Sequence, residues 1–310
     1  MRDLQRRLHA IGFDCGAAEP GEFSELTEQA VTRFQVERGL TPSGRCDQPT
    51  WAALVEAGFR LGDRQLFLRA PVLRGDDVAE LQRTLGTLGF DAGRVDGIFG
   101  AETRNALTEF QRNTGLPTDG ICGYETTAAL RRYASRHDGL EGVAAVRERE
   151  SLLAQPRTLH GRRIVIGHFG GLGSLTRSVA RAARTAGGLV LALDDRPASE
   201  QAVAANEFSA EVYLGLCVAS DRSGASFYAT EGFRSAGGER LASLLVDDLN
   251  AVLSRVRDAP SAMRLPILRE TRMPAVLVEL GPVSEVVLRA PQVTVAILTA
   301  LQAWVSAPFD

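Results

Sequence analysis

Apolar residues in the first 134 positions recur every three or four residues, which is the spacing of one face of a helix. The clearest run consists of Val78, Leu81, Leu85 and Leu88. Asp76 and Asp77 precede this run, and such residues supply an N-cap and a favourable negative charge at a helix start. Gly89 follows the run and can take the left-handed conformation that ends a helix. The pattern therefore predicts a helix between these two signals.

Two further amphipathic stretches follow, at residues 101–112 and 124–132. The predicted inner face of the first consists of Thr103, Ala106, Leu107 and Phe110. Asp96-Gly97 predicts a turn before it, and Gly115 predicts its end. Residues 76–134 are therefore expected to form three short helices joined by tight loops.

The same pattern occurs earlier in the chain. The matching pairs are Leu4-Gln5 and Leu81-Gln82, Gly12-Phe13 and Gly89-Phe90, Phe34-Gln35 and Phe110-Gln111, and Gly44-Arg45-Cys46 and Gly120-Ile121-Cys122. A duplicated unit predicts two copies of one small fold, and usually of one binding surface. We expect the first copy over residues 1–58 and the second over residues 70–134.

Strands and helices alternate after Gly161, which is typical of α/β layer structures. The expected strands are 163–166, 189–193, 211–218, 225–230 and 275–279, and the expected helices are 175–186, 198–209, 237–257 and 291–305. Residues 161–310 are therefore expected to form an α/β domain. Residues 135–160, which include a charged helical stretch at 144–153, are expected to be a linker. The predicted fold class is multidomain, with two small all-α three-helix domains followed by an α/β domain.

The composition is that of an ordinary soluble globular protein, at 45% hydrophobic and 24% charged residues. A net charge of −3 gives no reason to expect a nucleic-acid partner, and no apolar run is long enough for a membrane span. The first helix follows Met1 with no apolar signal region before it. Together with only four cysteines, this favours a cytoplasmic protein with reduced thiols. A Cys15–Cys46 bridge is the alternative.

The second helical unit resembles the peptidoglycan-binding domain of bacterial cell-wall enzymes. The residues that carry the resemblance are Leu81-Gln82, Leu85, Gly89, Val95-Asp96-Gly97-Ile98-Phe99-Gly100, Thr103, Ala106-Leu107, Phe110-Gln111, Gly115-Leu116, Asp119-Gly120, Gly123 and Thr126. The first copy departs from this pattern, with Pro20-Gly21-Glu22-Phe23-Ser24 where the second has residues 96–100. We therefore expect peptidoglycan binding on the second copy, by Asp96, Gly97, Phe99, Gly100, Thr103 and Gln111. The alternative is that the polar members of this set only cap helices and shape turns.

Residues 163–305 are similar to the zinc-dependent N-acetylmuramoyl-L-alanine amidases of the amidase-3 type. The strongest match is the stretch LPILRETRMPAVLVELG, from Leu265 to Gly281. The resemblance implies that Glu279, at the end of a buried strand, corresponds to the catalytic glutamate of the family. The family holds zinc with two histidines and a glutamate, so that the metal activates a water molecule and a carboxylate takes its proton.

This resemblance fails at the metal ligands. The first family histidine lies in a D-P-G-H-G-G motif, and residues 166–171 here read IGHFGG, so His168 is the candidate. The second ligand is a glutamate that opens the next helix, but residues 172–188 contain no Asp or Glu. The third is a histidine in an S-I-H-A-N strand end, which corresponds to Cys217. No catalytic zinc is therefore expected, and the alternative is a zinc site that keeps His168 and Cys217 with one further ligand.

The same residues also have structural interpretations. Cys217 is of a type that often packs as a small buried residue, and His168 can be a loop residue. Glu279 needs a partner if it is buried, and Arg269 or Arg272 could supply one. Glu279 and Arg269 are thus either a structural pair or remnants of catalysis. The glycine-rich loop at 170–173 lacks the spacing and the Lys-Ser/Thr pair of nucleotide-binding loops, so no nucleotide is expected.

The whole arrangement resembles the CwlM-type amidase homologues of actinobacteria, including the runs Phe59-Arg60-Leu61-Gly62 and Arg74-Gly75-Asp76-Asp77-Val78-Ala79. The resemblance implies a cytoplasmic pseudoenzyme that binds peptidoglycan or its precursors. It also implies contact with a peptidoglycan biosynthetic enzyme and regulation of peptidoglycan biosynthesis. Two alternatives stay open, namely an active zinc-dependent amidase and a passive module that anchors in the cell wall after export.

Overall fold

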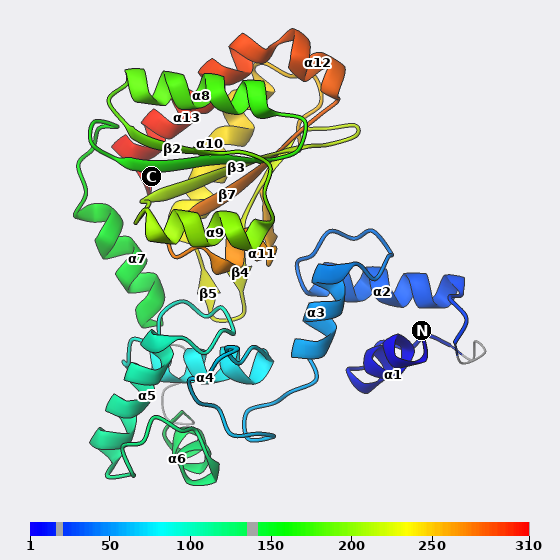
Figure 1. Ribbon diagram of the computed structural model, residues 1–310, viewed down its shortest axis with the longest axis vertical. Coiled ribbons are helices and arrows are strands. Elements are labelled where there is room, and N and C mark those ends of the chain that lie inside the picture. The colour runs from blue at the N-terminus through cyan, green and yellow to red at the C-terminus, as the bar shows by residue number, and fades with distance from the viewer. Residues whose placement is uncertain (17–20, 135–141, 310) are drawn as a thin grey trace. The chain divides into compact units, whose positions relative to one another are not determined.

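The computed structural model describes residues 1–16, 21–134 and 142–309, and the chain divides into two compact units (Figure 1). The first unit comprises Met1–Val146 and Thr230–Phe233, and the second comprises Arg147–Ala229 and Arg234–Asp310. The expected linker at 135–160 therefore lies partly outside the described residues, as does Pro20 of the first repeat.

The first unit contains two three-helix repeats, as the duplicated pattern predicted. Their helices are α1 (Arg2–Ala10), α2 (Glu25–Glu37) and α3 (Gln48–Glu56), then α4 (Asp76–Thr87), α5 (Ala101–Thr114) and α6 (Tyr124–Ala134). Each repeat has its own apolar core, around Leu8 and Phe34 in the first and around Leu81, Leu107 and Phe110 in the second. The helical faces expected from the sequence are thus buried.

The start of α4 differs from the expected N-cap. The helix begins at Asp76 with Gly75 at its N-cap position, and Asp77 is fully buried. The Nε of Arg64 lies 2.7 Å from Oδ2 of Asp77, which offsets the cost of burying this carboxylate. A Cβ at Gly75 would come within 2.2 Å of Oδ1 of Asp77, so only glycine fits before the helix. At the other end, Gly89 has the expected left-handed conformation, with φ of +92°.

The second unit is a mixed sheet with helices on both faces. Its strands are β1 (Arg163–Phe169), β2 (Leu189–Leu193), β3 (Val212–Val218), β4 (Gly224–Thr230), β5 (Phe233–Arg234), β6 (Ser261–Met263) and β7 (Ala275–Leu280). Its helices are α7 (Val143–Leu153), α8 (Gly173–Thr185), α9 (Ala198–Glu207), α10 (Ala236–Asn250), α11 (Pro266–Glu270), α12 (Val283–Leu288) and α13 (Ala290–Ser306). The strand order is β2-β1-β3-β7-β4-β5, with β6 beside β4. The first four of these strands are parallel, and β4 runs antiparallel to β7.

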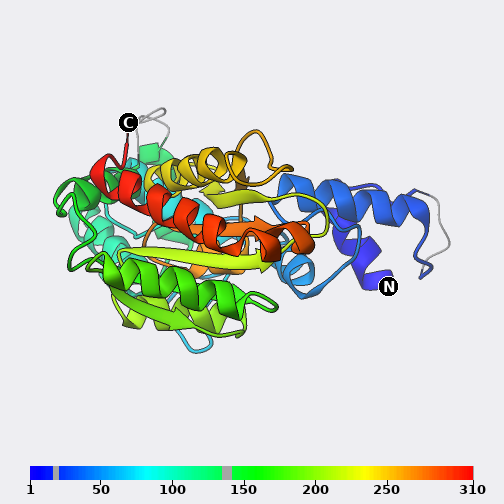
Figure 2. The ribbon, with the colours of Figure 1, turned by 90° about the horizontal axis from the view of Figure 1, so that it is seen from above.

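The sheet lies between two helical layers (Figures 1 and 2). Helices α8, α10 and α13 cover one face, where Ile166, Leu216 and Val278 share a core with Leu245 and Ile297. Helices α9 and α11 cover the other face. This architecture confirms the multidomain fold class with a C-terminal α/β domain.

Helix α10 is shorter than its apolar pattern predicted, because it ends at Asn250 and not at Arg257. The residues that follow pair with the chain just before β4. The N–H of Ser223 donates to the carbonyl of Arg255 (2.7 Å), and the N–H of Arg257 donates to the carbonyl of Ser223 (2.9 Å). This pairing takes the segment out of the helix. Elements β5, β6, α11 and α12 were not expected, because two to six residues carry too little periodicity to predict them.

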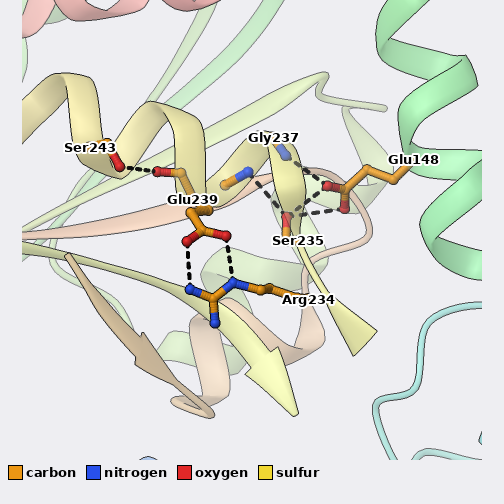
Figure 3. A network of polar contacts seen from close by, with 7 residues as sticks. Glu148, Arg234, Ser235, Gly237, Glu239 and Ser243 are labelled. Carbon is orange, nitrogen blue, oxygen red and sulfur yellow. Dashed lines mark hydrogen bonds and ion pairs between the residues drawn. The ribbon is translucent and has the colours of Figure 1, made fainter. Parts of the chain in front are cut away.

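Glu148 of α7 caps the start of α10 (Figure 3). Its carboxylate accepts hydrogen bonds from Oγ of Ser235 and from the N–H of Gly237, both at 3.0 Å. The Oγ of Ser235 in turn accepts from the N–H of Gly238 at 3.2 Å. Leu152 of α7 is buried in the core of the α/β unit. From Arg147 onward, the charged helix is therefore an integral part of this unit.

Candidate functional site

The carboxyl ends of β1, β3 and β7 bring together the residues for which the resemblance to the amidases implied metal binding or catalysis. The register pairs Phe169 with Cys217, and Cys217 with Glu279. Side chains at paired positions of neighbouring strands project to the same face of a sheet. Phe169, Cys217 and Glu279 therefore share one face, the face that α9 and α11 cover.

His168 lies one position earlier and belongs to the opposite face, in register with Leu216 and Val278. It is only 7% exposed, and its Nε2 would lie 3.3 Å from a Cβ at Gly173, the first residue of α8. The expectation that His168 and Cys217 act as a pair is thus corrected, because a shift of one residue along a strand reverses the face. When the D-P-G-H-G-G motif is aligned on Gly170-Gly171, its histidine falls on Phe169.

Two buried contacts fix the end of β1 in this arrangement. Gln201 of α9 donates from Nε2 to the carbonyl of His168 (3.0 Å) and accepts a hydrogen bond from the hydroxyl of Tyr213 (2.8 Å). A Cβ at Gly167 would come within 1.9 Å of Oε1 of Gln201. The Phe169 ring lies over Gly215, whose Cβ would be 3.2 Å from it. The two glycines leave the space that the glutamine side chain and the phenyl ring occupy.

Glu279 is held by an arginine that the sequence did not indicate. Oε2 of Glu279 lies 2.6 Å from Nη1 of Arg257, which follows α10. The arginine side chain passes over Gly224, where a Cβ would meet its Cδ at 2.9 Å. The expected partners were Arg269, which is half-buried on α11, and Arg272, which is exposed. This ion pair offsets the negative charge of the carboxylate that the resemblance to the amidases implied as catalytic.

Cys217 is a neutral thiol in this site. Its pKa is raised to about 12, mostly by burial and also by the negative charge of Glu279, while the positive charge of Arg257 opposes both effects. Its Sγ donates a weak hydrogen bond to the carbonyl of Val278 at 3.7 Å. Because the thiolate is the form that binds metals and attacks electrophiles, Cys217 is a poor ligand and a poor nucleophile here.

The residues present do not fit the catalytic zinc of the amidases. That site needs two histidines and a glutamate with one open position. Here an apolar ring and a protonated thiol stand at two of the ligand positions, and residues 172–188 provide no carboxylate. Within residues 1–16, 21–134 and 142–309, no group of three or more His, Cys, Asp or Glu side chains is placed to hold a metal.

The predicted peptidoglycan-binding residues of the second repeat are largely engaged inside the fold. Nε2 of Gln82 donates to Oδ1 of Asp96 (2.8 Å) and to Oγ1 of Thr103 (3.1 Å), while its Oε1 accepts from the N–H of Gly97 (2.8 Å). Phe99 and Thr103 are buried, Gly97 has φ of +70°, and Gly100 is the N-cap of α5. These residues shape and fix the loop before α5. Their direct contact with a glycan stays a prediction.

Gln111 makes the same arrangement in the next loop. Its Nε2 donates to Oδ1 of Asp119 (2.8 Å) and to Oγ1 of Thr126 (3.3 Å), and its Oε1 accepts from the N–H of Gly120 (2.9 Å). Gln111 is therefore a structural residue in this fold, whatever else it contacts.

The first repeat contains this glutamine arrangement twice as well. Gln35 binds the N–H of Gly44 (2.9 Å) and the hydroxyl of Thr50 (2.9 Å). Gln5 binds the N–H of Gly21 (2.9 Å), and its contact with Thr27 is longer, at 3.4 Å. Four buried or half-buried glutamines thus hold four loops in one way. In the sequence this arrangement is visible as a glutamine followed by a loop glycine and, six residues after the glycine, a threonine. Of the four glutamines, only Gln111 was predicted to contact peptidoglycan.

Comparison with known proteins gives a family match for the two helical repeats. The family described as "Putative peptidoglycan binding domain" matches residues 1–54 and 74–130. Both helical repeats match this family. CwlM of Mycobacterium tuberculosis, named an N-acetylmuramoyl-L-alanine amidase, is 47% identical over 146 residues, which are 46% of this chain and 36% of that protein. CwlL of Bacillus licheniformis, with the same activity in its name, is 30% identical over 152 residues, 42% of each chain.

The matches to these curated relatives span less than half of either relative. Among solved structures, an N-acetylmuramoyl-L-alanine amidase from Clostridium difficile 630 covers 48% of this chain and 98% of its own, with 16% identity and a TM-score of 0.39. The sequence match to CwlM over 146 residues agrees with the resemblance to CwlM-type amidase homologues. None of the helices within the described ranges has the length and apolarity that a membrane crossing requires.

Proposed function

We propose that this protein binds peptidoglycan or its precursors through its helical repeats and does not hydrolyse them. The observation that carries the second half of the proposal is the register of Phe169, Cys217 and Glu279. Zinc-dependent hydrolysis requires a metal-bound water and a carboxylate free to take its proton. At these positions the chain offers an apolar ring, a protonated thiol and a carboxylate bound to arginine.

We further propose that the protein regulates peptidoglycan biosynthesis in the cytoplasm and contacts a biosynthetic enzyme. The resemblance to CwlM-type homologues supports this role. A domain with an amidase-like scaffold and no metal ligands can still bind a wall fragment, because binding does not require the metal that hydrolysis requires. Passive anchoring in the cell wall is the competing non-enzymatic role, and localisation of the full chain in cell fractions separates the two.

Binding is tested by co-sedimentation of the full chain with purified, insoluble peptidoglycan. We expect the protein to pellet with the polymer and to be released by soluble muropeptides. The variant Asp119→Asn tests the charge of the second repeat. It keeps the acceptor oxygen that Gln111 uses and removes only the negative charge. A chain that stays entirely in the supernatant, and that soluble precursors do not stabilise against heat, would contradict the binding half of the proposal.

An active amidase is the second candidate, and one observation favours it, namely that Glu279 is retained at the end of β7. Metal analysis of the purified full chain separates the candidates. We expect less than about 0.1 zinc per chain after dialysis, because the donor set lacks the geometry of a zinc site. One zinc per chain, lost on Cys217→Ala, would favour the enzyme.

A further inference from the structure

The outer surface of the α8–α13–α10 layer has an unusual distribution of charge. Helix α13 lies between the other two (Figure 2) and has no charged residue in its 17 positions. Its outward side chains include Gln292, Val295 and Thr299, and Val295 is 63% exposed. A solvent-facing helix without charge is unusual, since the outer face of a surface helix is typically charged or polar.

The helices on either side of α13 carry opposite charges. Helix α8 exposes Arg177, Arg181 and Arg184 and contains no acidic residue. Helix α10 has one charge of each sign near its start, Glu239 and Arg240, and two aspartates near its end, Asp247, which is exposed, and Asp248, which is half-buried. Burial raises the pKa of Asp248, and the charge of Asp247 raises it further. Among the residues that the structure describes, neither aspartate forms an ion pair with a basic side chain, so both lack a compensating charge.

The basic and acidic flanks meet the same end of α13. Arg162, just before β1, lies over the ring of Trp304 near the end of α13, at 5.7 Å. The start of α13 therefore lies toward the carboxyl end of β1. Helix α8 begins at that same end. The end of α10 also lies at the start of α13, because the two enclose a groove of about 490 Å³ lined by Asp248, Val252, Gln292 and Val295 among others. Arg177 and Asp247 are therefore on opposite sides of the first half of α13.

We propose that this face pairs with the same face of a second copy of the chain. A two-fold axis parallel to α13 would place Arg177 of each α8 against Asp247 of the other copy's α10. The uncharged helices and the exposed Val295 would then lie between the copies. A face with both signs on either side of a neutral strip is complementary to itself, whereas a partner of one sign would be repelled by one flank.

The size of the face agrees with a reversible dimer. A helix of this length spans about 25 Å, and three adjacent helices of about 10 Å diameter give roughly 700 Å² per copy. Stable interfaces bury about 800 Å² on each partner, so the face is about large enough for a specific dimer. The pairing is independent of peptidoglycan binding and of the absence of hydrolysis.

Charge reversal provides the test, with sedimentation equilibrium of the full chain as the measurement. We expect wild-type chain to dimerise, and the dissociation constants of R177D and of D247R to rise on the order of tenfold to a hundredfold. In a dimer of either variant alone, residues 177 and 247 of opposite copies carry the same charge. Because the dimer is two-fold symmetric, this repulsive contact occurs twice. An equimolar mixture of R177D and D247R restores both opposite-charge contacts and should therefore associate about as well as wild type.

The control variant is R272D, at an exposed arginine next to α11 on the other side of the sheet, which should leave association unchanged. Thermal melts of each variant show whether it folds, and R181D replaces R177D if R177D does not fold. A wild-type chain that is monomeric at about 100 µM would overturn the proposal. A dimer that R177D and D247R leave intact, or a mixture that stays monomeric, would overturn it equally.

Discussion

Phe169, not His168, stands in line with Cys217 and Glu279, and this one-residue difference decides what the site can do. In the sequence the two candidates are adjacent, and the only histidine of the motif is the natural choice. Strand register separates them, since neighbouring residues of a strand face opposite sides of the sheet. Register is a product of the pairing of β1 with β3, which no local pattern of residues 166–171 specifies.

A gain of zinc binding tests this assignment. In F169H/C217H two imidazoles would project from paired positions on the same face, and we expect zinc to bind at least tenfold more tightly than to wild type. The control is C217H, which leaves His168 and the new histidine on opposite faces and should gain much less. Competition with a chromogenic zinc chelator measures both affinities. Equal gains in the two variants would show that the faces are not separated as described.

The thiol of Cys217 offers a second residue-scale prediction. With a pKa of about 12, the reactive thiolate is scarce at neutral pH and increases as pH rises. The rate of alkylation by iodoacetamide at Cys217, followed by peptide mass spectrometry, should therefore increase steadily from pH 7 to above pH 10. In the unfolded chain the alkylation rate at Cys217 should level off above about pH 8.5, because that is the ordinary pKa of a cysteine thiol. A plateau near pH 8.5 in the folded protein would contradict the account.

The helices and strands themselves followed from periodicity, because most are long enough to show it. The two three-helix repeats, the alternation after Gly161 and the glycine that ends α4 were all predicted. Arg257 was not, because its segment reads as the continuation of α10 and leaves the helix only to pair with Ser223. The glutamines were noticed as repeat markers, but their bonds to loops many residues away depend on tertiary packing.

The glutamine arrangement gives an element-scale prediction. Gln82→Ala would leave the buried N–H of Gly97 and the hydroxyl of Thr103 without this partner, and we expect a loss of about 2–4 kcal/mol in the free energy of unfolding. The matched control is Asn113→Ala on the exposed side of α5, which should cost less than about 0.5 kcal/mol. Urea unfolding of the full chain, followed by circular dichroism, compares them. Equal small effects would mean that the loop before α5 is held by other contacts.

At the scale of the whole molecule, the two repeats and the α/β unit have diverged to different degrees. The second repeat keeps the full glutamine–aspartate–threonine arrangement at both loops, while the first has serine in place of aspartate at Gln35. The α/β unit has a glutamate at the end of β7, but the residues paired with it in register, an apolar ring and a protonated thiol, do not fit a catalytic zinc. The molecule therefore combines two repeats that match a peptidoglycan-binding family with an α/β unit whose strand-end residues do not fit a catalytic zinc.

Hydrolysis of peptidoglycan by the full chain tests this claim most directly. Purified protein with added zinc is incubated with peptidoglycan, and newly freed amino groups of L-alanine are quantified against an active family amidase as positive control. We predict no release above that of the enzyme-free blank, and no change on Glu279→Ala. Zinc-dependent release of stem peptides that Glu279→Ala abolishes would contradict the account.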